Sequence, residues 1–119
     1  MSNKLSPGCV IDVHKVDLTI ANVQTEQVVS GAPQTGFVEI GTFGNFELGI
    51  WEHTVGTSTD TETDEVFIVL AGKAIVEFLN TEKPAIHIHA GSIVQLSEGM
   101  ETKWTVEQTL RKVYLVASE

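Results

Sequence analysis

The chain has 119 residues, of which 42% are apolar, and a formal net charge of −9, which fits one folded acidic domain and excludes a disordered chain. Such an acidic charge argues against a nucleic-acid partner, because phosphate contacts need cationic side chains. The longest apolar run, Val66 to Ala71, is far shorter than the roughly 20 residues of a membrane span, and the N-terminus lacks the apolar stretch of a signal peptide. A single cysteine, Cys9, favours a reducing compartment. We therefore expect a cytoplasmic protein without a membrane partner.

Short runs rich in Val, Ile, Thr and Phe follow one another along the chain, separated by Gly, Asn, Asp or Pro. No helical pattern of about 11 residues or more stands out, so the pattern predicts an all-β fold with little helix. The expected strands, in chain order, are Cys9–Val16, Thr25–Val29, Phe37–Phe43, Phe46–His53, Asp64–Ala71, Lys73–Leu79, Ala85–His89, Ser92–Leu96, Glu101–Gln108 and Leu110–Val116.

The residues between these runs have backbone preferences that end a strand. Gly44-Asn45 and Gly72-Lys73 suit tight turns, in which a residue adopts positive φ. Asn80 to Pro84 is a polar stretch that ends in a residue unable to donate to a strand ladder. The polar run from Gly56 to Thr63 is the most loop-like segment, and loops of this kind serve either as solvated connections or as functional segments.

Two glycine-containing motifs lie in order on the predicted strands. In residues 64–72, Glu65 is followed, after six residues, by Gly72. In residues 90–99, a glycine, five residues, Ser97, one further residue and a glycine follow one another. These stretches resemble the two motifs of the cupin family, with Ser97 at the position where the family usually has Pro.

A third piece refines this resemblance. Trp104-Thr105-Val106, followed by Arg111-Lys112-Val113-Tyr114, is similar to the small single-cupin group named after (S)-ureidoglycine aminohydrolase. The resemblance covers residues 49–114 and implies a double-stranded β-helix, a cupin jelly-roll barrel with a cavity inside. Because no linker or repeat divides the chain, we expect a single cupin domain over residues 1–119.

The resemblance also locates the family's metal ligands, which are two His and a Glu from the first motif and a His from the second. The Glu corresponds to Glu65. Residues 58–61, where the first-motif His should lie, contain none, and Thr102 stands at the place of the second-motif His. A lone carboxylate does not hold a transition metal without partners. We therefore expect no metal and no other cofactor; were a divalent transition metal to bind, Glu65 and His53 would be its ligands.

Glu65 is the main candidate for a functional residue. Strand alternation places it on the same face as Phe67 and Val69, so its carboxylate should point into the barrel. An inward carboxylate can act as a general acid or base, or bind a ligand's amine. The alternative is a structural role, in which Glu65 accepts hydrogen bonds from Thr102 or an indole N–H.

Two tryptophans are expected beside this carboxylate. Trp104 shares its strand face with Thr102, and Trp51 shares its face with His53. Aromatic walls with one carboxylate describe a small-molecule pocket, and they equally describe a small barrel filled by side chains. The pattern leaves both possibilities open.

Other polar residues are expected at the surface. Because Ile86 and Ile88 should take the core face of their strand, His87 and His89 should point outward. Surface positions are also expected for His14, Arg111 and Lys112, with neutralisation of a carboxylate by one of the two cations as the alternative. Cys9 lacks the neighbours of a nucleophile.

Three functions follow from these residues. The first is a barrel that binds a small polar metabolite through Glu65. The second is a metal-dependent enzyme that resembles ureidoglycine aminohydrolase and releases ammonia from a small nitrogenous substrate. The third is a non-catalytic structural or partner-binding barrel. The expected N-terminal strands would leave an edge that needs covering, so we also expect a homodimer.

Overall fold

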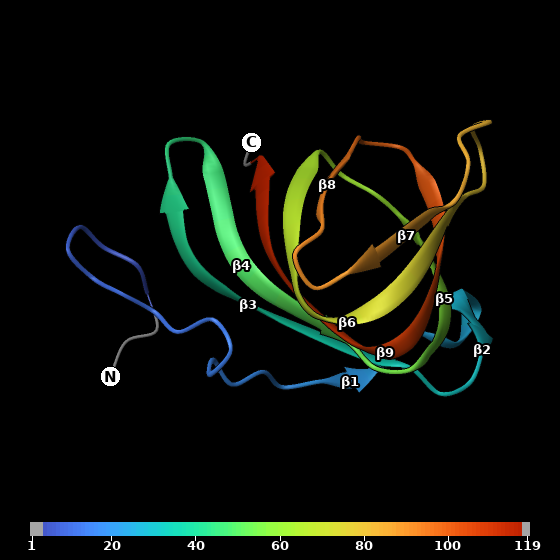
Figure 1. Ribbon diagram of the computed structural model, residues 1–119, viewed down its shortest axis with the longest axis horizontal. Coiled ribbons are helices and arrows are strands. Elements are labelled where there is room, and N and C mark those ends of the chain that lie inside the picture. Colours follow the sequence, from blue (N-terminus) through green and yellow to red (C-terminus); the bar gives the residue numbers. More distant parts are fainter. Residues whose placement is uncertain (1–3, 118–119) are drawn as a thin grey trace.

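The chain folds mainly into β-strands in the computed structural model, which describes residues 4–117 (Figure 1). The elements in chain order are β1 (Ala21–Asn22), the 3-10 helix η1 (Thr25–Gln27), β2 (Val28–Ser30), β3 (Gln34–Phe43), β4 (Phe46–His53), β5 (Gly56–Thr61), β6 (Glu65–Phe78), β7 (Ile86–His89), β8 (Ile93–Leu96) and β9 (Glu101–Ala117). The predicted all-β class with little helix is confirmed.

The long strand β9 organises the sheet. It pairs with β6 along one edge, and with β5 and then β4 along the other. β6 in turn pairs with β7 and β8, while β3 and β1 extend the sheet beyond β4, and β2 extends it beyond β5; all these pairs are antiparallel. The sheet curls strongly around an interior (Figure 1). This is the jelly-roll barrel that the sequence resemblance implies.

Alternation along β6 and β9 builds the core of the barrel. Phe67 and Val69 from β6, and Trp104, Val106 and Leu110 from β9, are at most 3% exposed. Full burial of a large apolar side chain contributes about 1.5–3 kcal/mol. Because every second side chain of a strand shares a face, the same alternation directs Glu65 of β6 and Lys112 of β9 toward the interior.

A second apolar cluster lies on the opposite face of β3 and β4, where Ile40 and Ile50 are buried. Residues 4–20, the N-terminal segment, cross the outside of the sheet before β1 (Figure 1). Val16 of this segment packs into the cluster, and the backbone N–H of Leu5 donates to the carbonyl of Ile40 at 2.6 Å. The segment therefore covers apolar surface that the barrel leaves open.

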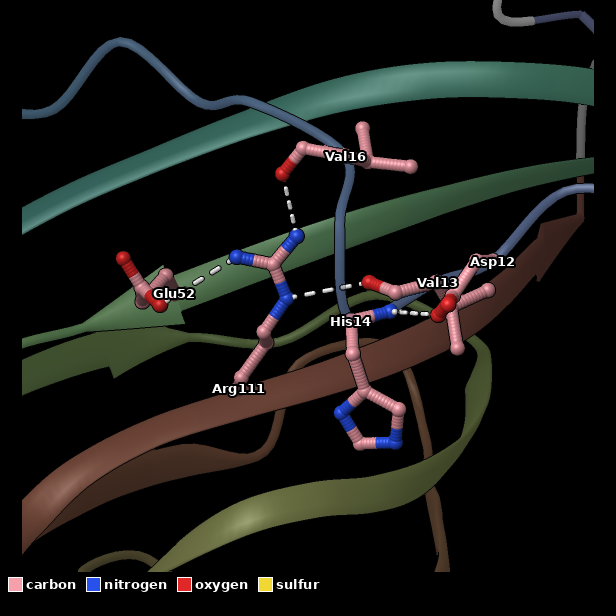
Figure 2. A network of polar contacts seen from close by, with 6 residues as sticks. All are labelled: Asp12, Val13, His14, Val16, Glu52 and Arg111. Atoms are coloured by element: carbon pink, nitrogen blue, oxygen red, sulfur yellow. Dashed lines mark hydrogen bonds and ion pairs between the residues drawn. The ribbon is translucent and has the colours of Figure 1, made fainter.

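Arg111 fastens the N-terminal segment to the sheet (Figure 2). Its Nε donates to the carbonyl of Val13 at 3.1 Å, and its guanidinium also donates to the carbonyl of Val16. On the sheet side, it forms an ion pair with Glu52 at 3.4 Å, and both side chains are largely buried. The predicted surface position of Arg111 is therefore wrong, because the N-terminal segment covers it.

We expect Arg111→Met to loosen the N-terminal segment and to lower the free energy of unfolding by about 1–3 kcal/mol, because hydrogen bonds from a charged group contribute about this much and Glu52 loses its partner. Urea unfolding and limited proteolysis within residues 4–20 measure both effects. Lys15→Met is the matched control, since the ion pair of Lys15 with Asp12 is exposed and 4.0 Å long and should contribute little. Unchanged protease resistance in Arg111→Met would contradict the fastening role.

The first two predicted strands need correction. Cys9–Val16 contains no strand; the Asp12 carboxylate accepts the backbone N–H of His14, and the Asp12 carbonyl accepts that of Lys15, so a turn replaces the extended chain. Thr25–Val29 divides into η1 and the start of β2. One of the two strands behind the expected dimer edge is therefore absent, and the homodimer stays a prediction for sedimentation to test.

The predicted loop from Gly56 to Thr63 is also wrong in large part, because residues 56–61 form β5. This strand pairs with β9 from Gly56↔Val106 to Thr61↔Glu101, and with β2 on its other side. Its polar composition hides a strand that is rich in β-branched threonine, which favours extended backbone.

Gly44 and Gly72 both adopt positive φ, as predicted, but only one lies in a turn. Gly44 connects β3 to β4 beside the pair Phe43↔Phe46. Gly72 lies within β6, where the register with β9 shifts, so the two predicted strands on either side of it are one. The chain likewise continues through residues 108–110, and the last two predicted strands are both parts of β9.

Candidate functional site

A cavity of about 540 Å³ lies within the barrel, against the inward faces of β3, β4, β5 and β9. This volume falls in the range of about 300–1,000 Å³ that small-molecule sites occupy. Its aromatic wall consists of Phe37, Trp51, Trp104 and Tyr114. Its charged lining consists of Glu47, Asp60, Glu62, Glu65 and Lys112.

Lys112 and Glu65 form a buried ion pair on the cavity wall. The Lys112 Nζ donates to Glu65 Oε2 at 2.7 Å, and the two side chains are 5% and 9% exposed. Alternation places both groups inward, since Glu65 shares a face of β6 with Phe67 and Val69, and Lys112 shares a face of β9 with Leu110. Glu65 therefore points into the barrel as predicted, whereas Lys112 does not lie at the surface.

Three aromatic rings enclose the ammonium of Lys112. Its Nζ lies 4.1 Å from the ring centroid of Phe67, 4.5 Å from that of Trp51 and 5.0 Å from that of Trp104. The negative face of an aromatic ring attracts a cation, and this attraction strengthens where water is excluded. The three rings and the Glu65 carboxylate together offset the free-energy cost of removing the Lys112 ammonium from water.

Glu62, and not Glu65, accepts the hydrogen bonds that the structural alternative for Glu65 predicts. The Thr102 hydroxyl donates to Glu62 Oε2 at 2.6 Å, and the Trp104 indole N–H lies 3.1 Å from the same oxygen and 2.9 Å from the Thr102 hydroxyl. Glu62 is only 6% exposed, and its side-chain hydrogen-bond partners are neutral donors. Thr102 lies beneath the cavity wall, and this network orients Trp104.

His53 is buried at the end of β4 with both ring nitrogens engaged. Nδ1 lies 2.6 Å from the carbonyl of Thr54, and Nε2 lies 2.8 Å from the hydroxyl of Ser58. A carbonyl can only accept, so Nδ1 carries the proton and Nε2 accepts from the hydroxyl. Burial lowers the pKa of His53, the backbone hydrogen bonds oppose this, and the charge of Lys112 lowers it further.

This shift predicts a loss of stability on acidification. As pH falls through about 6.5, the ordinary pKa, the unfolded chain takes up a proton at residue 53 while the folded protein does not. The free energy of unfolding should then fall by up to about 1.4 kcal/mol per pH unit. We expect His53→Gln to remove this part of the slope between pH 7.5 and 5.5 in urea unfolding, whereas His87→Gln, at an exposed position, should keep it. Equal slopes in His53→Gln and wild type would contradict the assignment.

Asp60, on β5, is another carboxylate of the cavity lining. Its Oδ1 accepts the backbone N–H of Thr61 at 2.9 Å, and no cation within residues 4–117 lies at ion-pair distance from it. Desolvation raises the pKa of Asp60 and the charges of Glu62 and Glu65 add to this, whereas the backbone N–H of Thr61 and the charge of Lys112 oppose it. Its carboxylate keeps contact with solvent, so it is open to a ligand.

The residues named as ligands for a metal do not fit one. Glu65 is engaged by Lys112, and both nitrogens of His53 are engaged by Thr54 and Ser58. Within residues 4–117, no group of three or more His, Cys, Asp or Glu side chains is arranged to hold a metal ion.

The structure brings together most of the predicted site residues. Glu65, Trp51, His53 and Trp104 line the cavity, and Thr102 lies behind it. His14, His87 and His89 are exposed, as predicted.

Sequence reasoning missed Glu62, Asp60 and Tyr114, and it gave Lys112 the neutralisation of a carboxylate only as an alternative to a surface position. For Lys112 the only available signal was its alternation with Leu110 and Tyr114, and this was ambiguous, because Val113 and Leu115 make the other face of the strand equally apolar.

The comparisons with known proteins agree with this fold. Residues 41–114 match the EutQ-like cupin domain. The chain belongs to the EutQ-like cupin family. A comparison with curated proteins finds no match.

Solved structures of cupins share the fold at low sequence identity. EutQ of Clostridium difficile is 14% identical, with a TM-score of 0.68 over 92% of this chain and 86% of its own. Ethanolamine utilization protein Q of Salmonella typhimurium is 14% identical, with a TM-score of 0.62 over 85% of this chain and 95% of its own. A protein of unknown function from Pseudomonas syringae is 20% identical, with a TM-score of 0.70 over 87% of this cupin but only 45% of its own chain. At these identities the likeness concerns the fold.

Residues 4–117 contain no helix with the length and apolar character that a membrane crossing requires.

Proposed function

We propose that this cupin barrel binds a small polar metabolite in its cavity, next to the Lys112–Glu65 ion pair. The observation that carries the proposal is a cavity of ligand size with a buried, hydrogen-bonded pair of opposite charges on its aromatic wall. An apolar cavity with a few convergent polar groups is the usual form of a small-molecule site. The Lys112–Glu65 pair would orient the polar groups of the ligand.

The tryptophans provide a direct test of binding in the cavity. The chain has two of them, and both line the cavity, so their fluorescence reports occupancy. We would screen ureides, amino acids, organic acids, sugars and ethanolamine by thermal shift and tryptophan fluorescence, with and without manganese, zinc and nickel. Ethanolamine joins the panel because two structural neighbours are named as ethanolamine utilization proteins. A ligand that raises Tm and changes the fluorescence supports the proposal; a silent panel would refute it and favour a barrel that binds partners on its outside.

The role of the ion pair is tested by removing both of its charges together. The double variant Glu65→Gln, Lys112→Met leaves no unpaired buried charge and is expected to fold. We expect it to lose the thermal shift given by the ligand. A double variant that folds and binds as well as the wild type would exclude the pair from recognition.

The second candidate is a metal-dependent release of ammonia from a small nitrogenous substrate. It is supported by the resemblance of residues 104–106 and 111–114 to the ureidoglycine aminohydrolase group, and it is weakened by the engagement of Glu65 and His53 with protein partners. Ammonia release from a ureide that depends on added metal would establish it. We also propose a cytoplasmic homodimer, and sedimentation of a 12.9 kDa particle would contradict the dimer.

A further inference from the structure

We propose that the metabolite carries a positively charged amino group and that Asp60 is its counter-ion. This inference rests on the proposed small-molecule function and specifies the ligand class. It concerns the cavity as a whole, in which the aromatic wall and the balance of charge point to the same kind of ligand.

The balance of charge within the cavity favours a cation. Among the described lining residues, four carboxylates face a single ammonium. Lys112 compensates Glu65 through their ion pair. Glu62 accepts hydrogen bonds from Thr102 and the Trp104 indole, which are neutral donors and supply no opposite charge. Charges interact more strongly where water is partly excluded, so a cationic ligand is attracted and an anionic one is repelled.

The aromatic wall already holds one ammonium. The rings that enclose the Nζ of Lys112 at 4.1–5.0 Å include Trp51 and Trp104, which also line the cavity. Tyr114 and the exposed ring of Phe37 extend this wall. Aromatic faces beside carboxylates are the environment in which proteins recognise ligand ammonium groups.

Two lining carboxylates, Asp60 and Glu47, receive no side-chain hydrogen bond or ion pair within residues 4–117, and Asp60 is the one on which the charges of Glu62 and Glu65 act. Glu62 and Glu65 are occupied by side-chain donors, whereas Asp60 receives one backbone N–H and keeps contact with solvent. Desolvation and the charges of Glu62 and Glu65 raise the pKa of Asp60, against the opposing effects of the Thr61 N–H and Lys112, so the ionised form is less favourable in the folded protein than in the unfolded chain. A cation beside it would relieve this repulsion. A side chain that is costly to keep ionised, and that faces a cavity, is a candidate for function.

The raised pKa of Asp60 predicts how the variant Asp60→Asn affects stability. Because the pKa of Asp60 is raised on folding, the ionised carboxylate opposes folding above that pKa, and this opposition disappears as pH falls. Asp60→Asn removes the charge at every pH and should therefore fold with a Tm at neutral pH that equals or exceeds that of the wild type.

Three probes of nearly identical shape separate the effect of the ligand's charge on its affinity from the effect of its shape. Choline carries a permanent cation, 3,3-dimethylbutan-1-ol replaces its nitrogen by carbon, and 3,3-dimethylbutyrate carries a negative charge on the same skeleton. Binding is measured by tryptophan fluorescence and thermal shift at constant ionic strength. We expect choline to bind at least about ten-fold more tightly than the neutral probe, and the anion to bind most weakly. If the neutral or anionic probe binds as tightly as choline, the inference fails while the proposed small-molecule function stands; if no probe of any charge binds, the inference fails, and the screen described above decides the function.

The anchoring residue is tested with a matched pair of variants. We expect Asp60→Asn to weaken choline binding at least about ten-fold and to leave binding of the neutral probe unchanged. Glu107→Gln removes an exposed carboxylate outside the cavity lining and should bind choline like the wild type. Equal loss in both variants would indicate an effect of overall charge and would overturn the role of Asp60, as would wild-type choline affinity in Asp60→Asn.

Discussion

Lys112→Met is expected to lower the free energy of unfolding by about 3–5 kcal/mol, because it leaves Glu65 as an unpaired charge in a buried position. The Glu65 side chain is 9% exposed and receives its one side-chain hydrogen bond, within the described residues, from Lys112. Methionine fills most of the volume of the lysine stem between the rings of Trp51, Phe67 and Trp104, so the loss reports charge and not a cavity. Urea unfolding at pH 7 measures it.

The control for this prediction is the second half of a double-mutant cycle. Adding Glu65→Gln to Lys112→Met should recover most of the lost stability, because a neutral amide needs less solvation than a carboxylate. A double variant as unstable as Lys112→Met alone would mean that the lysine stabilises the barrel through its packing. A single variant within 1 kcal/mol of the wild type, roughly the value of a surface pair, would mean that water reaches the ion pair.

The second large effect is expected for Gly72→Ala in the middle of β6. Gly72 has a φ of +93°, and a Cβ there would lie 2.1 Å from the carbonyl oxygen of Thr109 and 2.7 Å from that of Gln108. Both contacts are with backbone, so relief requires β6 and β9 to separate at the point where their register shifts. We expect a loss of about 3 kcal/mol or more, from the unfavourable φ together with the steric conflict.

Gly91→Ala separates the two contributions. Gly91 has a similar φ of +96°, and a Cβ at this position would meet nothing within 4 Å. Its cost should therefore be that of the backbone conformation alone, about 1–2 kcal/mol. Chemical unfolding of both variants gives the difference, and equal losses would show that the close approach of β9 to Gly72 is unimportant for stability.

The strand period explains which features the sequence predicted well. The bounds of β4 match the expected Phe46–His53, and the inward direction of Glu65 follows from its alternation with Phe67 and Val69. The outward direction of His87 and His89 follows from the two isoleucines of the same strand. In each case one face of the strand is clearly apolar and the other polar, so the period of two residues fixes the face on which each side chain lies.

The same reasoning failed where that difference was missing. Residues 56–61 are too polar to show a buried face, and they form a strand because β9 and β2 supply backbone partners on both sides. Lys112 lies in a strand with apolar residues on both faces, so periodicity could not choose its direction. Its carboxylate partner, Glu65, is 47 residues away in the chain, and the local periodicity of a strand gives no information about so distant a partner.

The sequence by itself determined the all-β class, the cupin resemblance and the inward direction of Glu65, because these depend on local alternation and on motif spacing. Only the tertiary structure decided that Glu65 is paired with Lys112, that Glu62 holds Trp104, and that Asp60 remains open to the cavity. Those features depend on which strands become neighbours when the sheet curls, and strand pairing brings together residues whose separation along the chain carries no local signal.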